Sequence, residues 1–262
     1  MIVLIFLMAA GISALMMVAW LVQRRTGNGG WSDVFWSFAT GLAAVAGALG
    51  PGPRPGGRQI ALAVLAAAWS LRLGLYLWRR VASGPEDARY AAFRSDWGAA
   101  FEARMFGFLQ IQALAAFILA LMVLIAAHNP APLPQPGDIA GVFVLALALL
   151  GEGVADAQLR RFKATPGHHG KICDQGLWHL SRHPNYFFEW LIWVAFALFA
   201  LPLGGSYPWG WAALAGPALM YWLLVHVSGI PPLEAQMLKS RGDAFKAYQS
   251  RTNAFFPGPP RR

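Results

Sequence analysis

Residues 138–163, with the sequence DIAGVFVLALALLGEGVADAQLRRFK, begin as an apolar run and end in three cations. The apolar part is about 20 residues long, the length that an α-helix needs to cross the hydrocarbon core of a bilayer. Lys and Arg gather in the short cytoplasmic loops of membrane proteins. The stretch therefore predicts a membrane-spanning helix whose carboxyl end faces the cytoplasm.

The same pattern repeats along the whole chain. Its 262 residues are 57% hydrophobic with a mean hydropathy of +0.45, which is too apolar for an ordinary soluble domain. We expect an all-α integral membrane protein in which residues 1–262 form a single domain of seven transmembrane helices. The predicted spans are Met1–Val22, Trp31–Leu49, Arg58–Trp78, Met105–Ala127, Asp138–Leu159, Tyr186–Leu203 and Trp209–Val227.

The basic residues support this division because they fall into alternate gaps between the spans. Of the 21 Lys and Arg residues, 18 follow the first, third, fifth or seventh span. Only Arg54 and Arg58 lie on the opposite side, and Arg72 lies within a span. The partition predicts a cytoplasmic C-terminus and an N-terminus on the opposite side of the membrane, which is the periplasmic side if the membrane is a bacterial inner membrane. Met1–Trp20 lacks a basic leading segment and a cleavage site, so we expect a retained first span.

Charge and cysteine content limit the partners. The net charge of +9 follows mostly from the topology of a protein in a lipid bilayer, so we expect no nucleic acid; anionic lipid or an anionic cofactor remains as a partner. Residues 231–256 interleave apolar and charged side chains, which predicts a cytoplasmic interfacial helix. No sequence feature indicates an oligomeric state. We expect no metal, because the spacing fits no zinc pattern among His168, His169, Cys173, His179 and His183.

Three predicted spans carry polar side chains on one helical face. Ionisable groups at membrane depth are costly, so each needs a partner, a cavity or a function. Structural pairing, such as Asp33 with Arg72 or Asp156 with Arg160, is an open alternative for any single residue. Together the stripes predict a cavity that opens toward the cytoplasm. They comprise Asp33, Trp36, Ser37 and Thr40, then Trp69, Arg72 and Tyr76, then Glu152, Asp156, Arg160 and Lys163.

Residues 181–189, SRHPNYFFE, predict the start of a helix that binds an anion. Pro184 suits the first turn, where its missing N–H costs nothing. Free N–H groups at a helix start favour phosphate, and Arg and Lys lie nearby in the sequence. Asn185 and Glu189 share one face, and their amide and carboxylate suit the uncharged portion of a nucleotide.

Residues 176–189, GLWHLSRHPNYFFE, resemble the steroid 5-alpha-reductase superfamily, in particular a bacterial branch of seven-span proteins. Asp33 with Trp36, residues 71–73, and Asp87 with Arg89 and Tyr90 add weaker matches. The resemblance implies an NADPH-dependent reductase that saturates the carbon–carbon double bond conjugated to a 3-ketone, as in a 4-ene-3-oxo-steroid or a similar apolar enone. The NADPH contacts that it implies are Asp156, Arg160, Lys163, Lys171, Arg182, His183, Asn185, Tyr186 and Glu189.

The resemblance also implies catalytic residues, and here the match is imperfect. In the animal enzymes a span-2 carboxylate and a span-3 tyrosine clamp the ketone. Asp33 is the corresponding acid, but Trp69 stands at the tyrosine position, so either Tyr76 substitutes or the ketone is polarised differently. Trp36, Trp69 and Arg72 are the expected substrate contacts. A further departure is Phe188, where most relatives have glycine.

Two other functions compete with reduction. The His-Pro-x-Tyr element also resembles isoprenylcysteine and phospholipid methyltransferases, which bind S-adenosylmethionine. Their motif carries glycine at the position of Phe188 and usually two adjacent acids near Glu234, where this chain has one. A non-enzymatic transport or binding protein would predict inverted repeats and paired broken spans, which the sequence lacks.

The basic partition makes the topology testable. Reporter fusions at Gln135 and Gly205 should be periplasmic, and fusions at Gly84 and Gly167 cytoplasmic, because 18 cations lie on one side of the predicted membrane. A cytoplasmic signal at Gln135 would contradict the seven-span topology.

Overall fold

The computed structural model describes residues 1–51, 56–168, 170–201 and 207–261. Within these ranges the chain is helical and contains no strand. The α-helices are α1 Ile2–Thr26, α2 Trp31–Ala48, α3 Gly57–Ser83, α4 Ala88–Trp97, α5 Phe101–Ala127, α6 Pro136–Ala164, α7 Leu177–Leu180, α8 Pro184–Ala200, α9 Ala215–Trp222 and α10 Ile230–Arg251. Short 3-10 turns, η1 Gly98–Ala100 and η2 Pro208–Leu214, and a π-helical turn, η3 Leu223–Val227, lie between them.

The helices bear out the prediction of an all-α membrane protein only in part. Among the residues that the structure describes, five helical runs are long and apolar enough to cross a membrane, and they include α1, α3 and α6. Helix α8 has 17 residues, and the predicted end of its span at Leu203 lies outside the described residues. Helix α2 has 18 residues, about 27 Å at 1.5 Å per residue, which is slightly short for the bilayer core. The seven-span count and the orientation therefore remain predictions.

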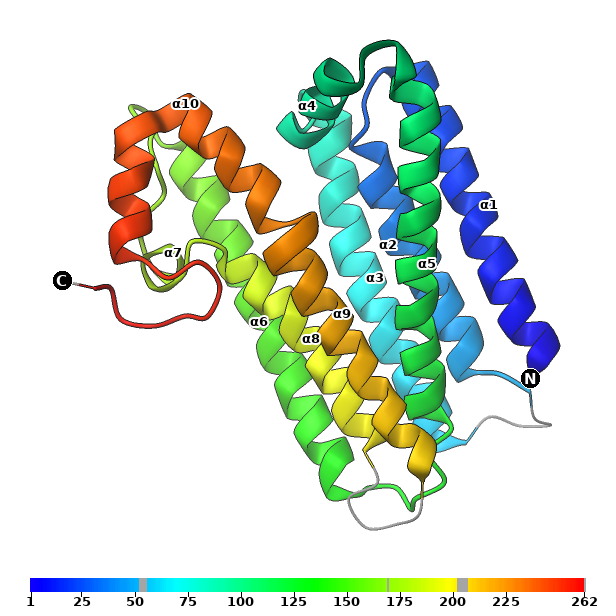
Figure 1. The fold of residues 1–262 in the computed structure, drawn as a ribbon. Coiled ribbons are helices and arrows are strands. Elements are labelled where there is room, and N and C mark those ends of the chain that lie inside the picture. The colour runs from blue at the N-terminus through cyan, green and yellow to red at the C-terminus, as the bar shows by residue number, and fades with distance from the viewer. Residues whose placement is uncertain (52–55, 169, 202–206, 262) are drawn as a thin grey trace. The chain divides into compact units, whose positions relative to one another are not determined.

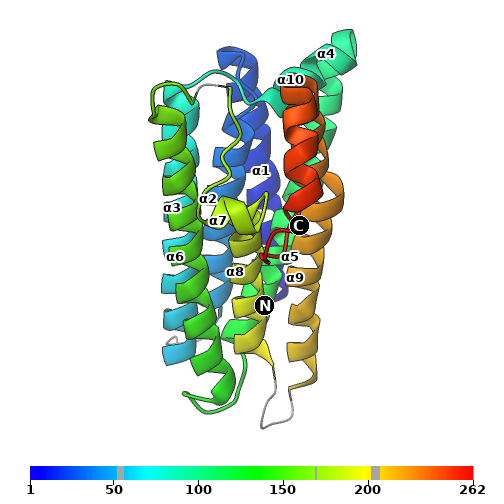
Figure 2. The ribbon, with the colours of Figure 1, turned by 90° about the vertical axis from the view of Figure 1, so that its left-hand side faces the viewer.

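The chain divides into two compact units. Unit 1 comprises residues 1–139 and 196–216, and unit 2 comprises residues 140–195 and 217–262. In unit 1, helices α1, α2, α3 and α5 run alongside one another, as Figure 1 shows. In unit 2, helices α6, α8 and α9 run alongside one another (Figure 2).

Small residues allow α2 and α3 to approach closely in unit 1. The Ser70 hydroxyl donates to the Ser37 carbonyl at 3.0 Å, and a Cβ at Gly41 would collide with the Ser70 side chain. A Cβ at Gly74 would likewise meet the ring of Phe38. Such close packing replaces the hydrophobic effect, which does not drive helices together within lipid.

A buried ion pair holds the end of unit 1 where α3 begins. Arg58 bonds Asp138 at 2.6 Å, and only 7% and 6% of the two side chains are exposed. The guanidinium also donates to the carbonyl oxygens of Asn129, Ala131 and Pro132. Arg58, one of the two exceptions in the basic partition, is therefore an internal structural residue.

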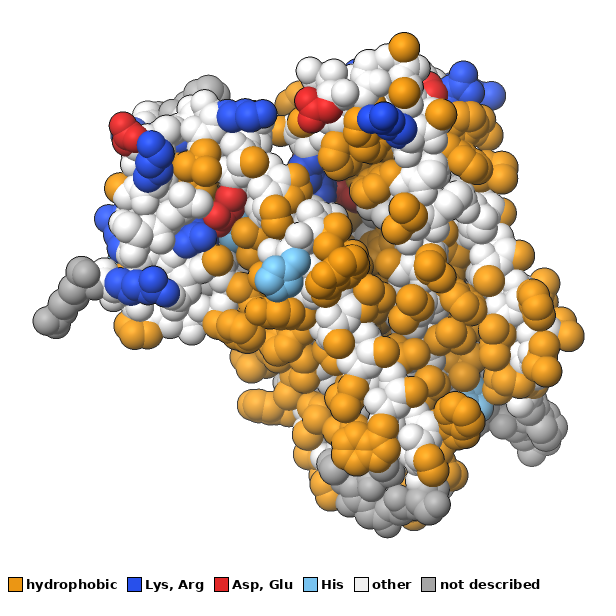
Figure 3. All heavy atoms as spheres, viewed as in Figure 1, with side chains coloured by type: hydrophobic (Ala, Val, Ile, Leu, Met, Phe, Trp, Pro, Cys, Tyr) orange, Lys and Arg blue, Asp and Glu red, His pale blue; other side chains and the backbone are white. Residues whose placement is uncertain are grey.

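Unit 2 combines an apolar stem with a polar end. Figure 3 shows hydrophobic side chains over α8 and α9, whereas Lys and Arg side chains gather around α10. Helix α10 confirms the predicted helix in residues 231–256 as far as Arg251 and bends at Gly242, whose φ is 50°. The helix ends at Arg251, five residues before the predicted end, because Thr252 is extended and turn-forming Asn, Gly and Pro residues follow it.

Two neighbouring glycines of α6, Gly151 and Gly153, provide a matched test of the packing between α6 and α8. A Cβ at Gly151 would overlap the Phe188 ring, whereas a Cβ at Gly153 would meet nothing within 4 Å. Gly151→Ala should destabilise the protein by about 1 to 3 kcal/mol through overpacking. Gly153→Ala should be neutral or stabilising by up to about 1 kcal/mol, because alanine favours helix.

Thermal unfolding in detergent measures both changes. The cost of Gly151→Ala should shrink in a Phe188→Ala background, because the colliding ring is then absent. Equal effects of the two glycine substitutions in the parent would contradict this packing.

Candidate functional site

Helix α8 begins at Pro184, so the structure confirms the helix start predicted from the SRHPNYFFE sequence. The residues before it do not extend into solvent. The Arg182 N–H donates to the Asn253 carbonyl at 2.8 Å, and the Gly258 N–H donates to the Leu180 carbonyl at 3.0 Å. The tail after α10 thus returns to the start of α8.

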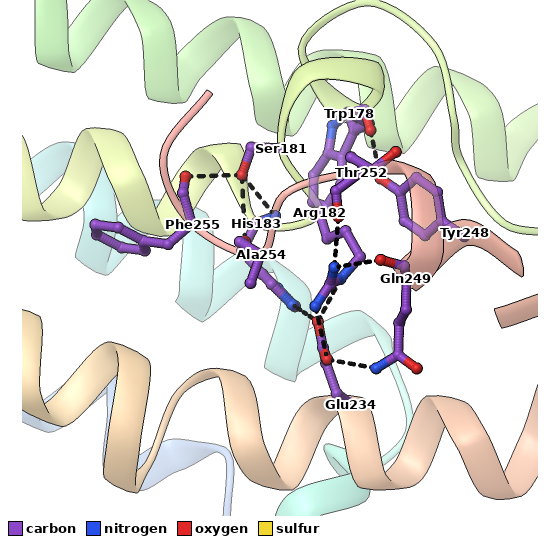
Figure 4. A network of polar contacts seen from close by, with 10 residues as sticks. All are labelled: Trp178, Ser181, Arg182, His183, Glu234, Tyr248, Gln249, Thr252, Ala254 and Phe255. Atoms are coloured by element: carbon purple, nitrogen blue, oxygen red, sulfur yellow. Dashed lines mark hydrogen bonds and ion pairs between the residues drawn. The ribbon is translucent and has the colours of Figure 1, made fainter. Parts of the chain in front are cut away.

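A polar network fills the space between the start of α8 and α10 (Figure 4). Arg182 Nε donates to Glu234 Oε1 at 2.7 Å, and Arg182 Nη2 donates to Glu234 Oε2 at 3.1 Å. His183 Nε2 lies 2.9 Å from Glu234 Oε1, and Gln249 Nε2 donates to Glu234 Oε2 at 2.7 Å. Arg182 Nη1 donates to the carbonyl oxygens of Gln249 and Thr252.

The protonation of His183 follows from this geometry. Burial holds the pKa of His183 below its ordinary value and Arg182 acts in the same direction, although the bond to Glu234 acts against them. The imidazole is therefore neutral near pH 7. Because a carboxylate only accepts hydrogen bonds, His183 Nε2 carries the proton that points at Glu234.

Hydroxyl groups and aromatic rings complete the docking of the tail. Ser181 Oγ donates to the Phe255 carbonyl at 2.9 Å and accepts from the His183 N–H at 3.1 Å. The Tyr248 hydroxyl donates to the Trp178 carbonyl. Aromatic side chains of α8, α9 and the tail pack together, namely Phe187, Trp190, Tyr221, Phe255 and Phe256.

Sequence reasoning missed the role of this tail. It assigned residues 231–256 to one interfacial helix and gave Glu234 no part in the site. The residues after Arg251 contain one Asn, one Gly and three Pro, which are turn-forming residues and signal that a helix ends. That signal marks the end of α10, but nothing in it indicates where the tail returns.

Helix α7 links the end of α6 to the start of α8. The Leu177 N–H donates to Gln158 Oε1 at 2.9 Å, and Trp178 Nε1 donates to the Ala155 carbonyl at 2.9 Å. Gly176 has a φ of 59° and lies against the Gln158 side chain, where a Cβ would collide. These contacts connect the α6 turns that carry Asp156, Arg160 and Lys163 to the segment that carries Arg182 and His183.

All nine residues predicted to contact a nucleotide lie in unit 2. Asp156 is buried, whereas Arg160 and Lys163 at the end of α6 and Lys171 in the following loop are exposed. Asn185 and Tyr186 are half-buried in the first turn of α8, and the Tyr186 ring stacks on His183 at 5.5 Å. Glu189 is buried and accepts from Trp193 Nε1 at 3.1 Å.

The predicted catalytic and substrate residues lie in unit 1. Asp33 accepts from Arg89 Nη2 and from the Tyr90 hydroxyl, each at 2.7 Å. Both partners belong to α4, so the structure pairs Asp33 with this helix. Arg72 and Tyr76 are half-buried one turn apart on α3.

A second carboxylate joins this cluster at the start of α4. Asp87 caps the helix by accepting from the Arg89 N–H at 3.0 Å, and it pairs with the side chains of Arg89 and Arg80. Burial by itself raises the pKa of Asp87, but the two guanidinium groups outweigh it and hold the pKa below its ordinary value. Asp33 and Asp87 therefore share Arg89, which attaches α4 to α2.

The two predicted substrate tryptophans contact each other within unit 1. Their rings meet edge to face at 6.4 Å. Trp36 Nε1 donates to the Gln112 carbonyl at 3.1 Å, and Trp69 is fully buried.

Comparison with known proteins gives one match. The family described as "Protein of unknown function (DUF1295)" matches residues 19–252, which span most of both units. No curated protein and no solved structure matches the chain. The chain belongs to the DUF1295 family, which is associated with steroid 5-alpha-reductase-like membrane proteins.

Proposed function

We propose that this protein is an NADPH-dependent membrane reductase that saturates the conjugated carbon–carbon double bond of a 3-oxo-4-ene steroid or a similar apolar enone. The observation that carries the proposal is the start of α8. There, Asn185 and the buried Glu189 share one helix face, directly after a segment anchored by Arg182 and His183. Membership of a family associated with reductases supports the same activity.

The chemistry of the donor set suits NADPH. Exposed Arg160, Lys163 and Lys171 supply cations for its phosphate groups, and α7 connects their segment to the start of α8. Asn185 can donate and accept hydrogen bonds, and the Glu189 carboxylate accepts them, which suits ribose hydroxyls and an amide. When bound, NADPH would supply the hydride for the β-carbon of the enone.

The remaining task is to polarise the ketone, which we assign to Asp33 or Tyr76. An ionised carboxylate cannot donate a hydrogen bond, so direct donation by Asp33 requires its protonated form. Arg89 and Tyr90 already donate to its two oxygens. Asp33 can therefore also act by holding α4, and the variants below distinguish the two roles.

The cofactor assignment is tested by substitution on α8. Asn185→Ala and Glu189→Ala should each weaken NADPH binding by about 1 to 3 kcal/mol, the usual cost of removing the partner of a buried polar group. Nucleotide fluorescence with purified protein measures the affinity. Ser250→Ala is the control, because this exposed hydroxyl bonds only the Ala247 carbonyl within its own helix.

Two outcomes would contradict this assignment. Unchanged NADPH affinity in both α8 variants would remove Asn185 and Glu189 from the site. Tight binding of S-adenosylmethionine by the parent protein, without NADPH binding, would instead indicate a methyltransferase.

The ketone assignment is tested by loss of enone absorbance with a 4-ene-3-oxo-steroid. If Asp33 donates directly, Asp33→Leu should lower turnover by about 10² to 10³, the cost of removing one oxyanion donor, and Asp33→Asn should retain some activity. Tyr76→Phe tests the alternative donor. Tyr90→Phe is the matched control, because it removes a partner of Asp33 and leaves the carboxylate in place.

The variants give separable results. A Tyr90→Phe protein as inactive as Asp33→Leu would show that Asp33 acts by holding α4. Full activity of Asp33→Leu with NADPH bound would exclude Asp33 from the reaction.

A further inference from the structure

We propose that Arg182 is a positioning residue, paired with Glu234, that holds the start of α8 so that Asn185 and Glu189 meet the cofactor. The inference rests on the proposed function. It assigns Arg182 a different role from the direct NADPH contact that the family resemblance implies, and it adds Glu234 to the site.

Four of the five N–H donors of Arg182 form hydrogen bonds within unit 2. A guanidinium has five N–H groups. In this structure Nε and Nη2 bond the two oxygens of Glu234, and Nη1 bonds two backbone carbonyls, those of Gln249 and Thr252. Only 10% of the Arg182 side chain is exposed. A phosphate group that displaced none of these bonds could meet only the second N–H of Nη2.

Glu234 is equally committed. A carboxylate has about four lone-pair positions for hydrogen bonds. Glu234 accepts from Arg182 twice, from His183 and from Gln249. The side chains of Arg182 and Glu234 cancel in charge, and the pair therefore adds little attraction for an anion.

The pair lies where a displacement would matter most. Residues 180–183 are tied to the tail by backbone bonds from Gly258 and to Asn253, and by the Ser181 hydroxyl. Asn185 follows two residues after His183, in the first turn of α8. A shift of this segment would therefore move Asn185 directly. In enzymes, a misplacement of about 1 Å can lower the catalytic rate by about 100-fold.

A double-mutant cycle with NADPH and NADH tests the proposal. The full-length variants are Arg182→Gln, Glu234→Gln and the double variant, and fluorescence gives the dissociation constant of each nucleotide. Each single variant should weaken the binding of both nucleotides by the same factor, about 10- to 100-fold, the range expected when a buried polar group loses its hydrogen-bond partner. The double variant should bind each nucleotide no more weakly than the weaker-binding single variant does. Either substitution alone already breaks the pair of Arg182 and Glu234, so the second removes nothing further.

The comparison of nucleotides separates positioning from phosphate contact, because NADH lacks the 2′-phosphate of NADPH. The proposal would be overturned if Arg182→Gln lost affinity for NADPH alone and Glu234→Gln kept the parental affinity for both nucleotides. Independent, additive losses would overturn it as well. Arg251→Gln is the matched control, since it breaks an exposed ion pair with Asp174 in the same unit and should leave both affinities unchanged.

Unfolding and parental binding resolve the remaining outcomes. Thermal unfolding identifies variants that fail to fold. Arg182→Lys and Glu234→Asp then replace them, and each should again weaken the binding of NADPH and of NADH by the same factor. A parent protein that binds neither nucleotide would overturn the proposed function and, with it, the positioning role. A parent that binds NADPH but shows no coupling between the two residues would overturn the positioning role alone.

Discussion

The ion pair of Arg182 and Glu234 connects residues 52 positions apart and brings three segments of unit 2 together. Burying two charges costs several kcal/mol each unless the geometry is good and the remaining donors and acceptors are satisfied. Here His183, Gln249 and the backbone of the tail satisfy them. Loss of one partner would leave the other charged and buried, so the whole arrangement depends on the pair.

In unit 1, charged pairs likewise hold both ends of the contact between α2 and α3. Arg58 and Asp138 form a buried pair at the end where α3 begins, and Asp33 with Arg89 and Tyr90 holds the end where α2 begins. Between them, small residues and a hydroxyl-to-carbonyl bond set the helix spacing. Apolar surfaces alone do not fix the register of helices in lipid, whereas charged and hydrogen-bonded groups do.

The Phe188 ring of α8 has a complementary feature in α6. In this protein the ring occupies the space that Gly151 leaves without a side chain. The ring is therefore accommodated against α6, and this contact explains Gly151 within the apolar run of residues 138–163.

The sequence by itself determined what depends on local pattern: the helical class, most helix boundaries to within a few residues, and the start of α8 at Pro184. Periodicity, apolar length and proline each act over one helix, so they are visible in the chain. The tertiary structure alone decided the partners: Glu234 for Arg182, the tail for Ser181, Arg89 and Tyr90 for Asp33, and Gly151 for Phe188. These choices join segments separated by tens of residues, and many acids and bases in the chain have the same local character. Only the packed fold determines which of them meet, because a buried charge is tolerated only where its complement lies within hydrogen-bonding distance.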